Sequence, residues 1–212
     1  MNNKIFIIGL PRTGTTSLCH SFLQLGYKTA HTAYTETALK EADVIADTPV
    51  FSEFPLLDAH FANSRFINLE RDLSKWVPSI RQLLARMHTN LMRSDGGFNT
   101  HLKRCYFETF GKYSLSDIQS DEYLINCYEQ HQQRVSNFFK DKKANLLTLN
   151  VAQPHSAKAL QTFLGTDADI QFEQLNMGGK VTAWNDIKHP DKIASTRNGK
   201  IDKSLGYNHK IL

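Results

Sequence analysis

The chain has 212 residues, enough for one domain with a substantial hydrophobic core. Its formal net charge of +4 is compatible with an anionic ligand but too mild to indicate a nucleic-acid partner. Cys19, Cys105 and Cys127 are widely spaced and form no C-x-x-C pair, so we expect reduced thiols rather than disulfides or metal ligands. No stretch approaches the roughly 20 apolar residues of a membrane span, and we expect a cytoplasmic protein without membrane contact.

The first motif begins where a short apolar run ends. Residues 4–8 predict a strand, and the segment from Gly9 to Ser17 (GLPRTGTTS) predicts a loop that leads into a helix. Glycines let the backbone curl so that successive N–H groups point inward, and the positive end of the helix favours an anion there. The spacing fits G-x-x-x-x-G-K-[ST], except that Thr15 replaces the lysine. The sequence therefore predicts a phosphate-binding loop whose nearby cation is Arg12.

The rest of the first half alternates between helical and extended patterns. The predicted elements are a helix over 15–25, a strand over 27–30, a helix over 35–42, a strand over 44–46, a helix over 54–61 and a strand over 65–69. Such alternation predicts an α/β fold with a central parallel sheet and helices on both faces.

A second polar motif follows the strand over 65–69. Arg71 comes two residues after the strand, and Ser79 lies eight residues further along the chain, in a helix that opens near residue 73. A guanidinium can bind a phosphate bidentately, and a hydroxyl on the helix can donate to another phosphate oxygen. The alternative for Arg71 is a salt bridge with Glu70 or Asp72.

The second half has fewer strands. Apolar residues recur at helical spacing over 76–92 and 121–139, with a polar, glycine-containing connection between them. Because Pro78 lies beyond the first helical turn, we expect its helix to start late or to kink. A last strand is predicted over 145–149, then a helix over 154–164 that ends at Gly165. Residues 176–212 form a polar, basic, loop-rich tail.

The loop variant P-[KR]-[ST]-G-T-[ST], together with the pair Arg71 and Ser79, resembles the sulfotransferases. The resemblance runs from about residue 4 to residue 165 and implies a three-layer fold like that of the P-loop-containing nucleoside triphosphate hydrolases, as one domain over 1–212. The chain looks like a compact, bacterial-type cytosolic member of the EC 2.8.2 type. The implied reaction moves a sulfuryl group from 3′-phosphoadenosine 5′-phosphosulfate (PAPS) to a hydroxyl or amine of a small-molecule or glycan acceptor, without a metal. Its nucleotide product would be adenosine 3′,5′-bisphosphate, and the sequence indicates no oligomeric state.

The resemblance also implies roles for individual residues. Those that would surround the 5′ end of the donor are Arg12, Thr13, Gly14, Thr15, Thr16 and Ser17. Arg71 and Ser79 would hold the 3′-phosphate. A carboxy-terminal loop covers the donor in this family, and Arg197, in an R-x-G element, and Lys180 are the candidate cations here, with Trp184 as a possible stacking partner for adenine.

The chemistry further requires a cation for the leaving phosphate and a base for the acceptor. Arg12 stays protonated and would stabilise the leaving group electrostatically. For the base we rank His31 first, Asp47 second and Glu36 third. His31 and Asp47 follow predicted strands, and Glu36 lies five residues after His31, near where the resemblance implies a glutamate in some branches of the family. We expect the acceptor pocket in an insertion over 94–120, which is rich in aromatic residues; a helical hairpin packed on the sheet explains the same residues.

Two other functions fit parts of the pattern. A P-loop kinase or nucleotidase would use ATP with magnesium; the absence of a lysine after Gly14 counts against it, whereas Asp47 could serve a metal. A nucleotide-binding module without catalysis would keep the loop but position no base.

Overall fold

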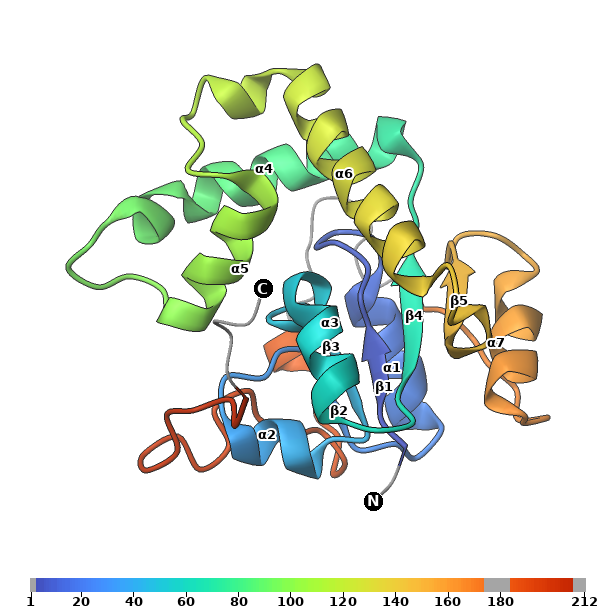
Figure 1. Ribbon diagram of the computed structural model, residues 1–212. Helices are drawn as coiled ribbons and strands as arrows, with labels where there is room; N and C mark the ends of the chain where they lie inside the picture. Colours follow the sequence, from blue (N-terminus) through green and yellow to red (C-terminus); the bar gives the residue numbers. More distant parts are fainter. Residues whose placement is uncertain (1–2, 174–183, 208–212) are drawn as a thin grey trace.

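The computed structural model describes residues 3–173 and 184–207. Their strands form one sheet in the order β2-β3-β1-β4-β5, and every pairing is parallel (Figure 1). The strands are β1 (Ile5–Ile7), β2 (Thr29–Ala30), β3 (Val44–Ala46), β4 (Arg65–Leu69) and β5 (Leu146–Leu149). The helices are α1 (Thr15–Gln24), α2 (Glu36–Glu41), α3 (Val50–His60), α4 (Leu73–Met92), α5 (Thr100–Phe110), α6 (Asp121–Phe139) and α7 (Ser156–Leu164), with short 3-10 turns at Asp117–Gln119, Lys143–Asn145 and Trp184–Asp186. The predicted three-layer α/β fold is confirmed.

Alternation along β1 explains why helices cover both faces of the sheet. Ile5 and Ile7 pack with α1 and α7 in one cluster, whereas Phe6 and Ile8 pack with α3 and the end of α6 in another. All four side chains are buried, as expected for a central strand of a parallel sheet, whose two faces are both covered. The sheet is therefore the middle layer of a sandwich.

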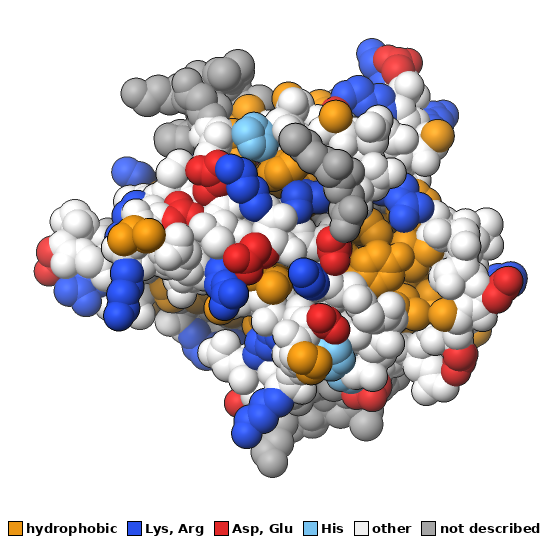
Figure 2. Space-filling view, turned by 90° about the horizontal axis from the view of Figure 1, so that it is seen from below, with side chains coloured by type: hydrophobic (Ala, Val, Ile, Leu, Met, Phe, Trp, Pro, Cys, Tyr) orange, Lys and Arg blue, Asp and Glu red, His pale blue; other side chains and the backbone are white. Residues whose placement is uncertain are grey.

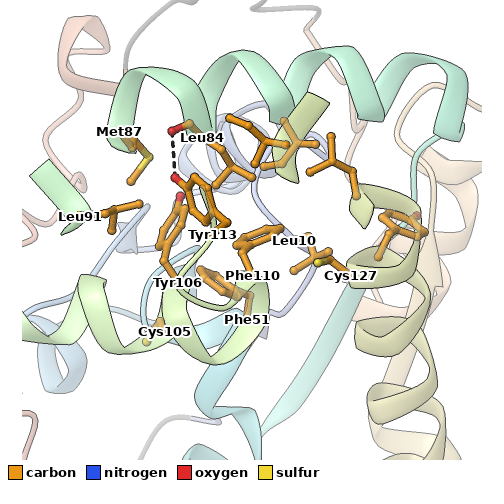
Figure 3. Close-up of a cluster of buried hydrophobic side chains, with 14 of the residues drawn as sticks. Leu10, Phe51, Leu84, Met87, Leu91, Cys105, Tyr106, Phe110, Tyr113 and Cys127 are labelled. Atoms are coloured by element: carbon orange, nitrogen blue, oxygen red, sulfur yellow. Dashed lines mark hydrogen bonds between the residues drawn. The ribbon is translucent and has the colours of Figure 1, made fainter. Parts of the chain in front are cut away.

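A third apolar cluster lies beyond the carboxyl ends of the strands, where α4, α5 and the start of α6 pack together (Figures 1 and 3). The segment over 94–120 contains α5, which begins after Asn99, whose side chain accepts a hydrogen bond from the Leu102 amide at 2.9 Å. Phe110 and Tyr113 are core residues, and the Tyr113 hydroxyl donates to the Leu84 carbonyl at 2.8 Å. The polar, glycine-containing connection lies on either side of α5, whose boundaries the sequence did not predict and whose buried aromatic residues fill this cluster.

Proline 78 does not delay or interrupt its helix, contrary to the expectation from its sequence. The helix α4 begins at Leu73 and continues through Pro78 to Met92. Pro78 is exposed, so water can hydrate the carbonyl that its missing N–H leaves free. The helix α3 does contain a break, at Glu53 (φ −103°, ψ 19°), and it starts before the predicted residue 54.

The tail over 184–207 follows the outer edge of the sheet. It forms a parallel bridge between Thr29 and Lys192, and it buries Ile193 and Leu205 against the cluster that contains α2. Figure 2 shows the molecule from below Figure 1, the end away from α4, where Lys and Arg mingle with Asp and Glu beside a patch of hydrophobic side chains. None of the described helices is long and apolar enough to cross a membrane.

Candidate functional site

A cavity of about 520 Å³ lies at the carboxyl ends of the strands. The strand order changes direction around β1, since β2 and β3 lie on one side of it and β4 and β5 on the other. Ligands of open α/β sheets bind at such a position. The residues that line the cavity come from the loop after β1, from the segments after the other strands, and from α4, α5 and the tail; they are Pro11–Ser17, His31, Asp47, Arg71, Asp72, Lys75, Ser79, Leu83, Tyr106, Asn150, Val151, Ala152, Phe172, Glu173 and Trp184.

The loop after β1 forms one wall of the cavity and needs glycine at residue 14. Gly14 has φ 109°, and a Cβ atom there would lie 2.6 Å from Val151 Cγ2. The buried Thr13 hydroxyl donates to the Leu10 carbonyl at 2.7 Å and closes the turn. α1 then starts at Thr15 without a side-chain cap, so the N–H groups of its first turn remain available to an anion.

Arg12 lies in this loop with a left-handed backbone (φ 73°). Its Nε donates to Ser79 Oγ at 2.8 Å, and its guanidinium makes no ion pair with any carboxylate of the described residues. Burial lowers the pKa of Arg12, and the charges of Arg86 and Arg71 lower it further. Clustered cations favour an anionic ligand between them, and the charge of Asp47 offsets their repulsion only in part.

Arg71 and Ser79 both contact this arginine. Arg71 Nη1 donates to the Arg12 carbonyl at 2.7 Å, and the Arg71 amide donates to the Tyr128 hydroxyl at 3.0 Å. No described carboxylate forms an ion pair with Arg71, because Asp72 pairs with Lys75 at 3.4 Å instead. The salt-bridge alternative for Arg71 is therefore not what the structure contains. Ser79 accepts from Arg12, which leaves its own O–H free to donate to a ligand.

His31 contacts the two threonines that open α1. Its Nε2 lies 3.2 Å from Thr15 Oγ1 and 3.0 Å from Thr16 Oγ1. The imidazole also packs against the Trp184 ring, with centroids 5.5 Å apart. Burial lowers the pKa of His31, although the charge of Asp47 opposes this effect. Burial therefore favours the neutral ring, and its Nε2 contacts two hydroxyl groups.

Asp47 follows β3 in a left-handed conformation (φ 49°), which aspartate tolerates better than most residues. Its Oδ1 accepts a hydrogen bond from the Thr48 hydroxyl at 3.2 Å. Burial raises the pKa of Asp47, and the charges of His31 and Arg12 and the hydrogen bonds from Thr48 only partly oppose it. A half-buried carboxylate that accepts few hydrogen bonds is suited to accept a proton.

Other candidates from the sequence do not reach the cavity. Glu36 forms an ion pair with Lys40 along α2, and Arg197 pairs with Glu41 at 3.0 Å. Both lie at the outer edge of the sheet, because the tail packs there, and the R-x-G match of Arg197 is a match in letters only. We therefore leave Glu36 and Arg197 out of the proposed site. Lys180 lies outside the described residues.

Several lining residues were missed by the sequence reasoning. Lys75 precedes Ser79 by one helical turn, so the helical period could have indicated it. Asn150 and Val151 follow the carboxyl end of β5. Asp47 was predicted because it follows the end of β3, and the same argument would have indicated these two residues. Phe172 lies in an irregular segment, and no sequence signal identifies it.

A parallel sheet with a glycine loop after its central strand and arginines at its carboxyl edge has the architecture of the P-loop-like α/β proteins. The model of one protein family, the sulfotransferase domain, matches residues 4–38 and 32–181. The chain therefore belongs to the sulfotransferase family, as its two motifs predicted. No curated protein shows a significant sequence match to it.

Proposed function

We propose that the protein transfers a sulfuryl group from PAPS to a hydroxyl or amine of an acceptor. The observation that carries the proposal is the hydrogen-bonded chain of Arg71, Arg12 and Ser79 beside the free N–H groups of α1. Together these groups would give two anion-binding positions in one cavity, as a donor with phosphate groups at both its 3′ and 5′ positions requires. Thr15, in place of the lysine that reaches the β and γ phosphates of ATP, favours this donor over a triphosphate.

The proposed donor would lie along the carboxyl edge of the sheet. Its 5′ end would bind the loop from Arg12 to Ser17, and its 3′-phosphate would bind Arg71, Ser79 and the adjacent Lys75. Val151, Phe172 and Trp184 pack against the same apolar cluster and line the cavity, so they offer an apolar wall for adenine.

In the proposed reaction, the acceptor oxygen or nitrogen attacks the donor sulfur, and the bond between sulfur and the 5′-phosphate oxygen breaks. The leaving product is adenosine 3′,5′-bisphosphate. Arg12 would stabilise the charge that builds on its 5′-phosphate, because the guanidinium is adjacent to the loop and half-buried. The proton of the acceptor goes to a base of the protein.

We assign the base to Asp47 and not to His31, which the sequence ranked first. His31 Nε2 already contacts the hydroxyls of Thr15 and Thr16, and burial, which lowers the pKa of the ring, makes it a weaker proton acceptor than an ordinary histidine. Its role is to orient Thr15 and Thr16. Among the described residues Asp47 accepts a side-chain hydrogen bond only from Thr48, and burial raises its pKa, which makes it a better proton acceptor than an ordinary aspartate.

Thermal stability tests the donor class directly, because a ligand that binds only the folded state raises the melting temperature. Adenosine 3′,5′-bisphosphate without metal should stabilise the protein more than AMP, ADP or ATP with magnesium. Greater stabilisation by ATP with magnesium would overturn the proposal in favour of phosphoryl transfer. Binding of the bisphosphate, but no sulfuryl transfer from PAPS to any acceptor or to water, would indicate a binding module.

A further inference from the structure

Arg86 lies just beyond the cavity lining, on the face of α4 that carries Ser79 and Leu83. Ser79 and Leu83 line the cavity from this helix, and Arg86 follows at the next position with the same helical period. Arg86 is exposed, and within 3–173 and 184–207 it makes no hydrogen bond or ion pair. By contrast, Arg81 on another side of α4 is fully engaged by Asp121 and by the Ile118 carbonyl. The guanidinium of Arg86 is therefore available to bind an anionic group of a ligand.

The position of Arg86 along α4 separates it from the proposed 3′-phosphate site. It lies seven residues beyond Ser79, which corresponds to about 10 Å of helix. In this direction the cavity is bounded by Asp47 after β3, by Leu83, and by the buried Tyr106 of α5, which Figure 3 shows among the aromatic side chains of the third apolar cluster. This is the side away from Arg71 and β4, and it is therefore the side left for the acceptor.

The electrostatics of this side favour a negatively charged molecule. Burial lowers the pKa of Arg12 most, and the charge of Arg86 lowers it further, so the two guanidinium groups repel each other, an effect that the charge of Asp47 opposes. An acceptor with an anionic group near Arg86 would relieve this repulsion, whereas a neutral acceptor would not. Leu83 and Tyr106 provide apolar surface for the part of the molecule between its anionic and its reacting groups.

We infer that the acceptor is a hydroxylated or aminated organic acid, whose nucleophile lies at Asp47 and whose carboxylate, or a similar anionic group, is bound by Arg86. The inference rests on the proposed function, because it names the acceptor class of the same reaction. It assigns to Arg86 a role in specificity, with no part in the chemical step.

Matched acceptors test the inference. One series is 4-hydroxyphenylacetate, its amide, and the analogue with a trimethylammonium group in place of the carboxylate; the other is 4-hydroxybutyrate, its amide, and its trimethylammonium analogue. Sulfuryl transfer from ³⁵S-labelled PAPS gives kcat/KM for each, and melting temperatures of the complex with adenosine 3′,5′-bisphosphate report binding of each.

The expected result is a preference for the carboxylate within at least one series. Arg86→Gln should lower kcat/KM for that carboxylate by about fivefold, the effect of one exposed ion pair, and should leave the amide unchanged. Arg86→Glu should move the preference toward the trimethylammonium compound. Arg93→Gln removes the same charge from the end of α4, where Arg93 pairs with Asp95 at 2.8 Å, and should change nothing.

Three results would overturn the inference. These are equal effects of Arg86→Gln on carboxylate and amide, weaker binding of PAPS in that variant, or no stabilisation of the bisphosphate complex by either carboxylate. Failure of the proposed function has a different signature, since the bisphosphate would then fail to stabilise the wild-type protein and both Arg86 variants alike.

Discussion

Arg71→Ala is the sharpest test of how the donor is recognised. The side chain is half-buried, lines the cavity, and spends one N–H on the Arg12 carbonyl at 2.7 Å, which leaves the other N–H groups of its guanidinium for a phosphate. Two charge-assisted hydrogen bonds at the lower end of their range, about 1.5 kcal/mol each, amount to about 3 kcal/mol. The variant should therefore bind adenosine 3′,5′-bisphosphate roughly 150-fold more weakly.

The assay is calorimetric titration with two ligands, adenosine 3′,5′-bisphosphate and AMP. Loss of the contact with the Arg12 carbonyl loosens the loop after β1 and weakens the binding of both ligands. Only the ratio of their dissociation constants therefore reports the contribution of the 3′-phosphate to binding. Arg81→Ala is the matched control, because it removes a guanidinium that contacts Asp121 and lies outside the cavity lining. A ratio that stays as in the wild type would refute the assignment and leave Arg71 as a support of the loop.

The remaining predictions concern the base, the loop and the apolar wall. Asp47→Asn should lower kcat by roughly 10²- to 10⁴-fold and leave stabilisation by the bisphosphate intact; retained turnover would exclude Asp47 as the base. Because burial raises the pKa of Asp47 and the ionised form accepts the proton, wild-type kcat should fall with decreasing pH, with a midpoint above that of an ordinary aspartate, as a pH–rate profile would measure. The same raised pKa means that ionised Asp47 opposes folding, so Asp47→Asn should raise the melting temperature near pH 7 but not at acid pH. Gly14→Ala should lower the free energy of unfolding by about 2–5 kcal/mol, of which about 1–2 comes from the backbone conformation and about 1–3 from overlap with Val151. Adding Val151→Ala should restore only the part due to overlap, as denaturant titrations would measure. Trp184→Ala should weaken the binding of AMP about tenfold without affecting the binding of inorganic phosphate. An equal loss of affinity for both ligands would argue against contact with adenine.

The features that the sequence predicted are those set by local pattern. The segments over 44–46, 65–69 and 121–139 match β3, β4 and α6 at both ends, because a buried run or a helical stripe is bounded by residues next to it in the chain. The loop from Gly9 to Ser17 could be predicted for a similar reason. Its strand, its glycines and the start of its helix are contiguous, and Gly14 is required by the conformation of its own backbone.

Pairings between distant segments could not be obtained in this way. Arg12 and Ser79 are 67 residues apart and meet only because β4 lies beside β1, which brings the start of α4 over the loop. Arg197 pairs with Glu41 because the tail follows β2, and its sequence match carries no information on that path. The sequence around His31 gives no sign that its ring is hydrogen-bonded, because its contacts with Thr15 and Thr16 depend on how β2 returns to the sheet.

The contact between Arg12 and Ser79 also connects the two ends of the proposed donor. Ser79 Oγ accepts from Arg12 Nε, so its hydrogen is directed to another acceptor, and a 3′-phosphate would take it without breaking the existing bond. The Arg12 carbonyl is fixed at the same time by Arg71. A phosphate bound by Arg71 and Ser79 would therefore hold both the backbone and the side chain of Arg12, whose remaining N–H groups would be left for the 5′ end of the proposed donor. In this arrangement, recognition of the 3′-phosphate orients the cation that stabilises the leaving group, which gives a physical reason why a 5′-phosphosulfate without the 3′-phosphate should be a poor donor.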